Sequence, residues 1–138
     1  MIISELRKLP AGQADVGVAH WAATHPLVRC YLSAITIKEL EYAVLLVERR
    51  DPHQGQRLRQ WLDGVYADFA ERVLPVSGTI ARRAASLHVP DPAPEADAYI
   101  AATALTHDLS LITRNVAHFA RFPALTVINP WGDAVASR

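Results

Sequence analysis

The sequence predicts a three-layer α/β/α fold, in which a mostly parallel β-sheet lies between two layers of helices. Short apolar runs that read as strands alternate with longer segments of helical periodicity, and this alternation is typical of parallel sheets. The chain has 138 residues, of which 51% are hydrophobic, enough for one domain with one core. We expect that domain over residues 1–133 and a loose tail over residues 134–138.

The first part of the chain predicts helices before any strand. Residues 1–8 are helix-like, and residues 15–25 carry apolar side chains on one face up to Pro26. The first predicted strand covers residues 28–32. An α/β chain usually begins with a strand, so the missing early strand is itself an observation about this sequence.

The middle of the chain predicts two long helices. Thr36 and Glu39 have the spacing of a capping box, which predicts a helix from Thr36 to about Arg50. Residues 56–72 form the clearest amphipathic segment of the sequence. Its apolar face consists of Leu58, Trp61, Leu62, Val65, Tyr66 and Phe69, with Arg57, Arg59, Gln60, Asp63 and Asp68 on the other side.

The last part of the chain predicts three more strands and a central helix. This helix begins with Pro94 in the first helical position and ends near residue 107. The other predicted elements are a strand over residues 73–76, a helix over 77–87 capped by Ser77, a strand over 110–113, a short helical piece over 116–121 and a strand over 125–128.

Composition limits the classes of partner and compartment. The formal net charge is zero, so no global field attracts nucleic acid or membranes. Cys30 is the only cysteine, which excludes an intrachain disulfide and suits a reducing compartment. No apolar run approaches the roughly 20 residues that a membrane span needs, and no signal-peptide pattern is present. We expect a soluble cytoplasmic protein with no membrane contact.

Three groups of polar residues follow predicted strands, where functional groups collect in parallel sheets. They are Thr36–Glu39, Glu95–Asp97 and Thr113–Asn115. Glu39 and Asp97 form the natural pair of carboxylates for a hard divalent cation such as Mg²⁺, and Asn115 offers a neutral oxygen. A cation held there would orient a phosphodiester and activate water.

Each of these residues also has a purely structural explanation. Glu39 completes the capping box, Asp97 complements the helix dipole, and Asn115 suits a turn. Other kinds of site lack support, because the sequence has no HExxH zinc motif and no glycine-rich nucleotide-binding loop. The arginines around residues 49–59 form either a solvated face or an RNA-binding one.

Several blocks of the sequence occur together in a known order. They are Ile3–Lys8, Leu32–Leu40, Ala96–Ala104, Leu111–Asn115 and Asn129–Trp131. Jointly these blocks resemble the PIN-domain toxins of the VapC/FitB type. The resemblance implies a PIN-like α/β/α fold and a metal-dependent endoribonuclease that uses Mg²⁺ or Mn²⁺. It also implies a cognate antitoxin as partner, RNA as substrate, and a homodimer or toxin–antitoxin assembly.

The resemblance assigns roles to individual residues. Glu39 and Asp97 match two of the family's acidic metal ligands. Asn115 matches a later catalytic position that is Asp in some members and Asn in others. Thr113 matches a supporting hydroxyl residue that lines the same pocket.

The sequence departs from the family at its beginning. Family members open with a strand that ends in an Asp-Thr-Asn-like segment, and Met1 occupies the position of that Asn. The first strand and the first metal-ligand Asp are therefore missing or truncated, and Glu5 lies on the following helix. We expect a start site assigned too far downstream. The alternatives are a catalytically impaired toxin-like protein that acts as an antitoxin-binding module, and a different phosphodiesterase such as a DNA nuclease.

Overall fold

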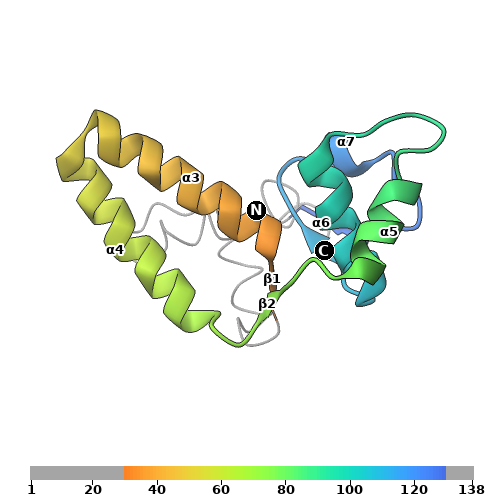
Figure 1. Cartoon of the computed structure of the whole chain (residues 1–138), viewed down its shortest axis with the longest axis horizontal. Helices are drawn as coiled ribbons and strands as arrows, with labels where there is room; N and C mark the ends of the chain where they lie inside the picture. The colour runs from red at the N-terminus through yellow and green to blue at the C-terminus, as the bar shows by residue number, and fades with distance from the viewer. Residues whose placement is uncertain (1–29, 130–138) are drawn as a thin grey trace. The chain divides into compact units, whose positions relative to one another are not determined.

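The computed structural model describes residues 30–129, which belong to two compact units (Figure 1). The hairpin unit comprises residues 31–76, and the described part of the α6 unit comprises residue 30 and residues 77–129. Each unit is described by itself. The predictions of two early helices, a missing first strand, Glu5 on a helix and a loose tail concern residues outside those that the structure describes.

The hairpin unit consists of two long helices flanked by two short strands. Its elements are β1 (Leu32–Ser33), α3 (Ala34–Arg50), α4 (Pro52–Asp68) and β2 (Val73–Leu74). β1 and β2 are parallel, with Leu32 opposite Val73. The helices α3 and α4 lie side by side as an antiparallel hairpin (Figure 1). Val44 of α3 is buried with Leu62, Val65 and Phe69, which confirms the predicted apolar face of residues 56–72.

The predicted capping box is wrong. Ser33 is the N-cap of α3, and its Oγ accepts a hydrogen bond from the Ile35 amide at 3.0 Å. Ser33 leaves β1 with extended backbone, so the helix starts there and Thr36 is already a buried residue of its first turns. Glu39 is therefore released from the structural role that the sequence suggested for it.

The helix α4 begins four residues earlier than predicted. Asp51 is its N-cap and accepts a hydrogen bond from the Gln54 amide at 3.2 Å, with Pro52 in the first turn. Such a cap and an early proline stabilise a helix start. Arg59, which the sequence placed on the polar face, lies half-buried against α3.

The α6 unit surrounds a helix of small residues. Its elements are α5 (Gly78–Ser86), α6 (Glu95–Thr106), β3 (Leu111–Ile112), α7 (Val116–Phe119) and β4 (Val127–Ile128). Ser77 caps α5 as predicted, with Oγ accepting from the Ile80 amide. The strands β3 and β4 are parallel, with Leu111 opposite Val127. The buried residues of α6 are Ala98, Ile100, Ala101, Ala102, Thr103 and Ala104.

These observations confirm an α/β fold of helices and parallel strand pairs. One local detail differs: Pro94 is the N-cap of α6, with ψ of 137°, and Glu95 is the first helical residue. A proline offers no side-chain acceptor, so the first turn of α6 has no capping hydrogen bond of that kind. Within residues 30–129, no helix combines the length and the apolar character needed to cross a bilayer.

Candidate functional site

Asp97 lies in the first turn of α6, close to the start of a well-buried helix. Its side chain is 18% exposed. Among the described residues, no donor makes a hydrogen bond to its carboxylate. A shielded carboxylate without hydrogen bonds is costly unless a positive charge lies close to it. Asp97 is therefore suited to hold a cation.

His118 is the nearest charged or chargeable neighbour that the structure gives Asp97. Its Nδ1 lies 3.9 Å from Asp97 Oδ2, and its side chain is 64% exposed. The position of His118 is set by the next residue, because Phe119 is buried and its ring contacts the Phe122 ring at 6.2 Å. The sequence analysis missed His118, although it lies one helical turn after Asn115.

Thr113 and Asn115 form the turn between β3 and α7. Thr113 is 1% exposed, and its Oγ1 accepts a hydrogen bond from the Asn115 amide at 3.0 Å. The Thr113 amide donates to the Ile128 carbonyl at 3.0 Å, which ties the turn to β4. The Asn115 side chain is exposed and makes no capping hydrogen bond to α7. Thr113 thus fixes the backbone, while the Asn115 side-chain oxygen is left for other partners.

The loop that leads into α6 is held by two side chains, His88 before the loop and Arg121 after α7. The Arg121 guanidinium donates to the carbonyls of Asp91 and Pro92 at 2.7 and 2.9 Å. His88 Nδ1 accepts a hydrogen bond from the Ala93 amide at 2.9 Å. These contacts order the chain immediately before the turn that carries Asp97.

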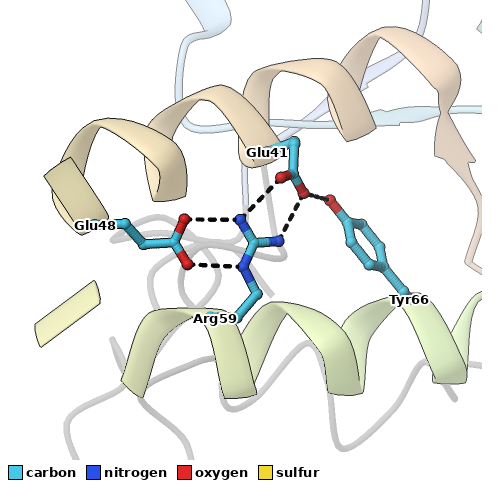
Figure 2. A network of polar contacts seen from close by, with 4 residues as sticks. All are labelled: Glu41, Glu48, Arg59 and Tyr66. Carbon is cyan, nitrogen blue, oxygen red and sulfur yellow. Dashed lines mark hydrogen bonds and ion pairs between the residues drawn. The ribbon is translucent and has the colours of Figure 1, made fainter. Parts of the chain in front are cut away.

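Glu39 belongs to the hairpin unit, where α3 carries several carboxylates. Figure 2 shows that two of the others are already paired with Arg59 of α4. Arg59 Nη1 and Nη2 each donate to Glu41 at 2.8 Å, and its Nε and Nη2 donate to Glu48 at 3.0 and 3.2 Å. The Tyr66 hydroxyl also donates to Glu41.

This network, formed by Glu41, Glu48, Arg59 and Tyr66, keeps its two carboxylates ionised. Hydrogen bonds from Arg59 and Tyr66 lower the pKa of Glu41 to about 2, and the hydrogen bonds from Arg59 also lower the pKa of Glu48. The two carboxylates raise the pKa of Arg59. Partial burial and the bond to Glu41 raise the pKa of Tyr66 to about 12.

Glu39 differs from these two glutamates because its side chain is exposed. In the part of the chain that the structure describes, it has no hydrogen bond or ion pair. Glu39 is consequently a carboxylate of α3 that is free to take a cation. It lies in the hairpin unit, whereas Asp97, Thr113 and Asn115 lie in the α6 unit, so the pairing of Glu39 with Asp97 stays a prediction.

The donor atoms offered by these residues suit a hard divalent cation. Asp97 and Glu39 provide carboxylate oxygens and Asn115 an amide oxygen, and Mg²⁺ binds through one or two carboxylates while keeping several waters. Across residues 30–129, no three His, Cys, Asp or Glu side chains gather into a closed metal cluster. The described part of the chain is therefore compatible with a partly hydrated ion and does not form a structural zinc centre.

Comparison with known proteins identifies relatives of this chain. The sequence matches the PIN domain over residues 13–125. It is 34% identical to the VapC ribonuclease Y4jK of Sinorhizobium fredii, over 96% of this chain and 95% of that protein. It is 37% identical to the toxin FitB of Neisseria gonorrhoeae, over 88% of this chain and 89% of that protein.

Solved structures are also similar to this chain. The crystal structure of FitAcB from Neisseria gonorrhoeae matches with a TM-score of 0.81 and 31% identity, over 95% of this chain and 94% of that chain. A toxin–antitoxin complex from Klebsiella pneumoniae matches with a TM-score of 0.62 and 29% identity, over 94% of each chain. Both likenesses extend over nearly the whole length of the chains compared.

Proposed function

This chain belongs to the PIN-domain family, with homologues among the VapC/FitB toxins of the toxin–antitoxin nucleases, and from that membership we propose its activity. We propose that it is the toxin of a toxin–antitoxin pair and a metal-dependent endoribonuclease that hydrolyses RNA phosphodiester bonds. Mg²⁺ is the proposed cofactor, with Mn²⁺ as a substitute, and the cytoplasm is the proposed place of action. A VapC ribonuclease among the relatives supports the choice of substrate.

The observation that carries the proposal is the state of Asp97. Its carboxylate is mostly shielded and accepts no hydrogen bond from the described residues. A charge that served only the helix dipole would gain by facing water, as the Glu95 side chain does with 75% exposure. The shielding of Asp97 instead favours a role as a cation ligand.

The residues of the chain divide the proposed work among them. Asp97 and Glu39 would hold the cation, which when bound supplies charge stabilisation and an activated water for in-line attack on phosphorus. Asn115 would contribute an amide oxygen to the ion directly or through water. Thr113 would keep Asn115 in place, because its hydroxyl oxygen accepts a hydrogen bond from the backbone amide of Asn115.

Measuring the rate of RNA cleavage by the Asp97→Asn variant tests the proposal, and the Glu95→Gln variant is the matched control. Both substitutions remove one negative charge from the first turn of α6, so a role in the helix dipole would give similar results for both. A role as metal ligand predicts loss of at least a hundredfold in cleavage for Asp97→Asn only. Equal activity of the two variants would contradict the assignment of Asp97.

Glu39→Gln extends the test to the hairpin unit. If Glu39 shares the cation with Asp97, this variant loses cleavage to a similar degree. The exposed Glu71→Gln serves as its control. Parallel assays with RNA and single-stranded DNA of the same sequence, with Mg²⁺, Mn²⁺ or EDTA, separate a ribonuclease from a DNA nuclease.

The exposed face of α3 favours a protein partner. Tyr42, Leu45 and Leu46 are 58%, 50% and 46% exposed, and large apolar side chains grouped on a surface mark interaction sites. A structure similar to this chain is a toxin–antitoxin complex, so we propose a cognate antitoxin as partner and a homodimer as the toxin's own assembly. Light scattering of the purified protein checks the dimer.

The same apolar face keeps the second candidate function, an antitoxin-binding module without nuclease activity. Coexpression with the product of an adjacent small gene distinguishes the two. A toxin forms the complex and cleaves RNA when released from it. A binding module forms the complex and leaves RNA intact under all metal conditions.

A further inference from the structure

We propose that His118 is a further ligand of the cation at Asp97, and that its imidazole makes the site favour Mn²⁺ over Mg²⁺. The inference rests on the proposed metal-dependent function and adds a nitrogen donor to the expected set of oxygen donors. Both residues belong to the α6 unit, so their geometry is defined within one compact unit.

The distance between the two side chains points to a shared ion. Nδ1 of His118 and Oδ2 of Asp97 are 3.9 Å apart, which is too long for a hydrogen bond. With metal–ligand bonds of about 2.1 Å, two ligands of one octahedral ion are about 3.0 Å apart when adjacent and about 4.2 Å apart when opposite. The observed separation lies between these two values, and a shift of the exposed imidazole by about 0.9 Å would bring Nδ1 to the adjacent-ligand distance.

The imidazole has the freedom that a ligand needs. It is 64% exposed, and in the described region neither ring nitrogen makes a hydrogen bond. The backbone beneath it is nevertheless fixed, because the His118 amide donates to the Asn115 carbonyl at 3.1 Å and Phe119 is buried. A fixed backbone with an uncommitted ring is suited to binding at a defined place.

The chemistry of nitrogen ligands gives the proposed preference. Mg²⁺ takes oxygen ligands and holds its waters tightly. Mn²⁺ has the lowest affinity for such sites among the first-row transition ions, but it accepts an imidazole nitrogen more readily than Mg²⁺ does. A site with Asp97 and His118 together should therefore bind Mn²⁺ more tightly than a site of carboxylates and waters alone, while Mg²⁺ gains little from the imidazole.

Binding of Mn²⁺ to the full chain tests the inference without any assay of cleavage. Calorimetry gives the affinities for Mn²⁺ and Mg²⁺, and electron spin-echo spectra of bound Mn²⁺ reveal a directly coordinated nitrogen as ¹⁴N modulation. The variants are His118→Ala, His118→Gln and Asp97→Asn. The exposed His53 of α4 provides the matched control, His53→Ala.

Nitrogen modulation is expected in the wild-type protein and in His53→Ala, and it should vanish in His118→Ala and His118→Gln. The preference for Mn²⁺ over Mg²⁺ should fall about tenfold in both His118 variants. Mn²⁺ that binds in dependence on Asp97 but shows no nitrogen from His118 would overturn this inference and leave the proposed metal site intact. Absence of any binding that depends on Asp97 would overturn both.

Discussion

The helices α3 and α4 approach each other closely at Gly55, and the substitution Gly55→Ala tests the packing of the hairpin unit. A Cβ built at Gly55 would lie 2.5 Å from the Cα of Glu48, 2.8 Å from its Cγ and 2.9 Å from its amide nitrogen. Two of these atoms belong to the backbone of α3. They cannot move aside without moving the helix.

Two opposing effects decide the result for Gly55→Ala. Alanine favours a helix over glycine by about 1 kcal/mol. To restore an ordinary contact near 3.4 Å, however, the helices must separate by about 0.9 Å at this point. Overpacking of this kind costs about 1–3 kcal/mol, and the separation also stretches the hydrogen bonds of Arg59 to Glu48. Because backbone atoms are involved, the upper part of this range, about 2–3 kcal/mol, applies, and after the gain of about 1 kcal/mol we expect a net loss of about 1–2 kcal/mol in the free energy of unfolding.

Gly64→Ala is the matched control, because Gly64 lies on the same helix and no atom would lie within 4 Å of its new Cβ. This variant should gain up to about 1 kcal/mol from helix propensity alone. Urea unfolding followed by far-UV circular dichroism measures both. With a slope of about 2 kcal/mol per molar urea, the midpoint of Gly55→Ala should fall by about 0.5–1 M. A midpoint equal to or above that of the wild type would refute the close packing of α3 on α4.

Three further predictions follow from side-chain hydrogen bonds. The pKa of Glu41 in the folded protein is about 2, below its ordinary value of 4.5. Ionised Glu41 therefore stabilises the fold above pH 4.5, and this contribution is lost as the pH falls toward 2. The difference in unfolding free energy between the wild type and Glu41→Gln should shrink over that range. Thr113→Val leaves the part-buried backbone amide of Asn115 without its acceptor and should cost about 1 kcal/mol in thermal or urea unfolding, whereas Thr113→Ser keeps the bond. Arg121→Gln removes the donors to two loop carbonyls before α6, so hydrogen exchange in that loop should accelerate while global stability changes little.

Local sequence patterns predicted the elements well where neighbours along the chain determine them. The apolar periodicity of residues 56–72 identified Leu62, Val65 and Phe69, which are all buried. Ser77 was identified as the cap of α5, and its hydroxyl accepts a hydrogen bond from the Ile80 amide. Periodicity and capping depend on residues three or four positions apart, and a sequence shows such spacings directly.

The start of α3 shows where local patterns are insufficient. Ser33 and Thr36 are both good caps, and Glu39 follows Thr36 at the capping-box spacing. The pairing of β1 with β2 extends the backbone up to Ser33, so the helix starts there. Leu32 pairs with Val73, 41 residues later in the sequence. This contact between strands therefore decided which residue caps the helix, a choice that the local sequence left open.

The residues of the candidate site show the same division between what local sequence patterns predict and what tertiary contacts decide. The sequence alone proposed Glu39, Asp97, Thr113 and Asn115 as candidates, because their blocks match a family in order and spacing. Their placement relative to partners was decided by tertiary structure: Arg59 neutralises Glu41 and Glu48, and His118 faces Asp97. Glu41 and Glu48 lie two turns apart on α3, as do Arg59 and Tyr66 on α4, a spacing that hinted at facing stripes without showing that they meet.

The order of helices and strands and the family of this chain were thus determined by its sequence, because periodicity, caps and motifs are properties of neighbouring residues. Only the folded chain decided which of the described acidic groups are paired with Arg59 and which are not. Ion pairs and hydrogen bonds between side chains act over a few ångströms, and the partners that come within this range are brought there by the packing of separate helices.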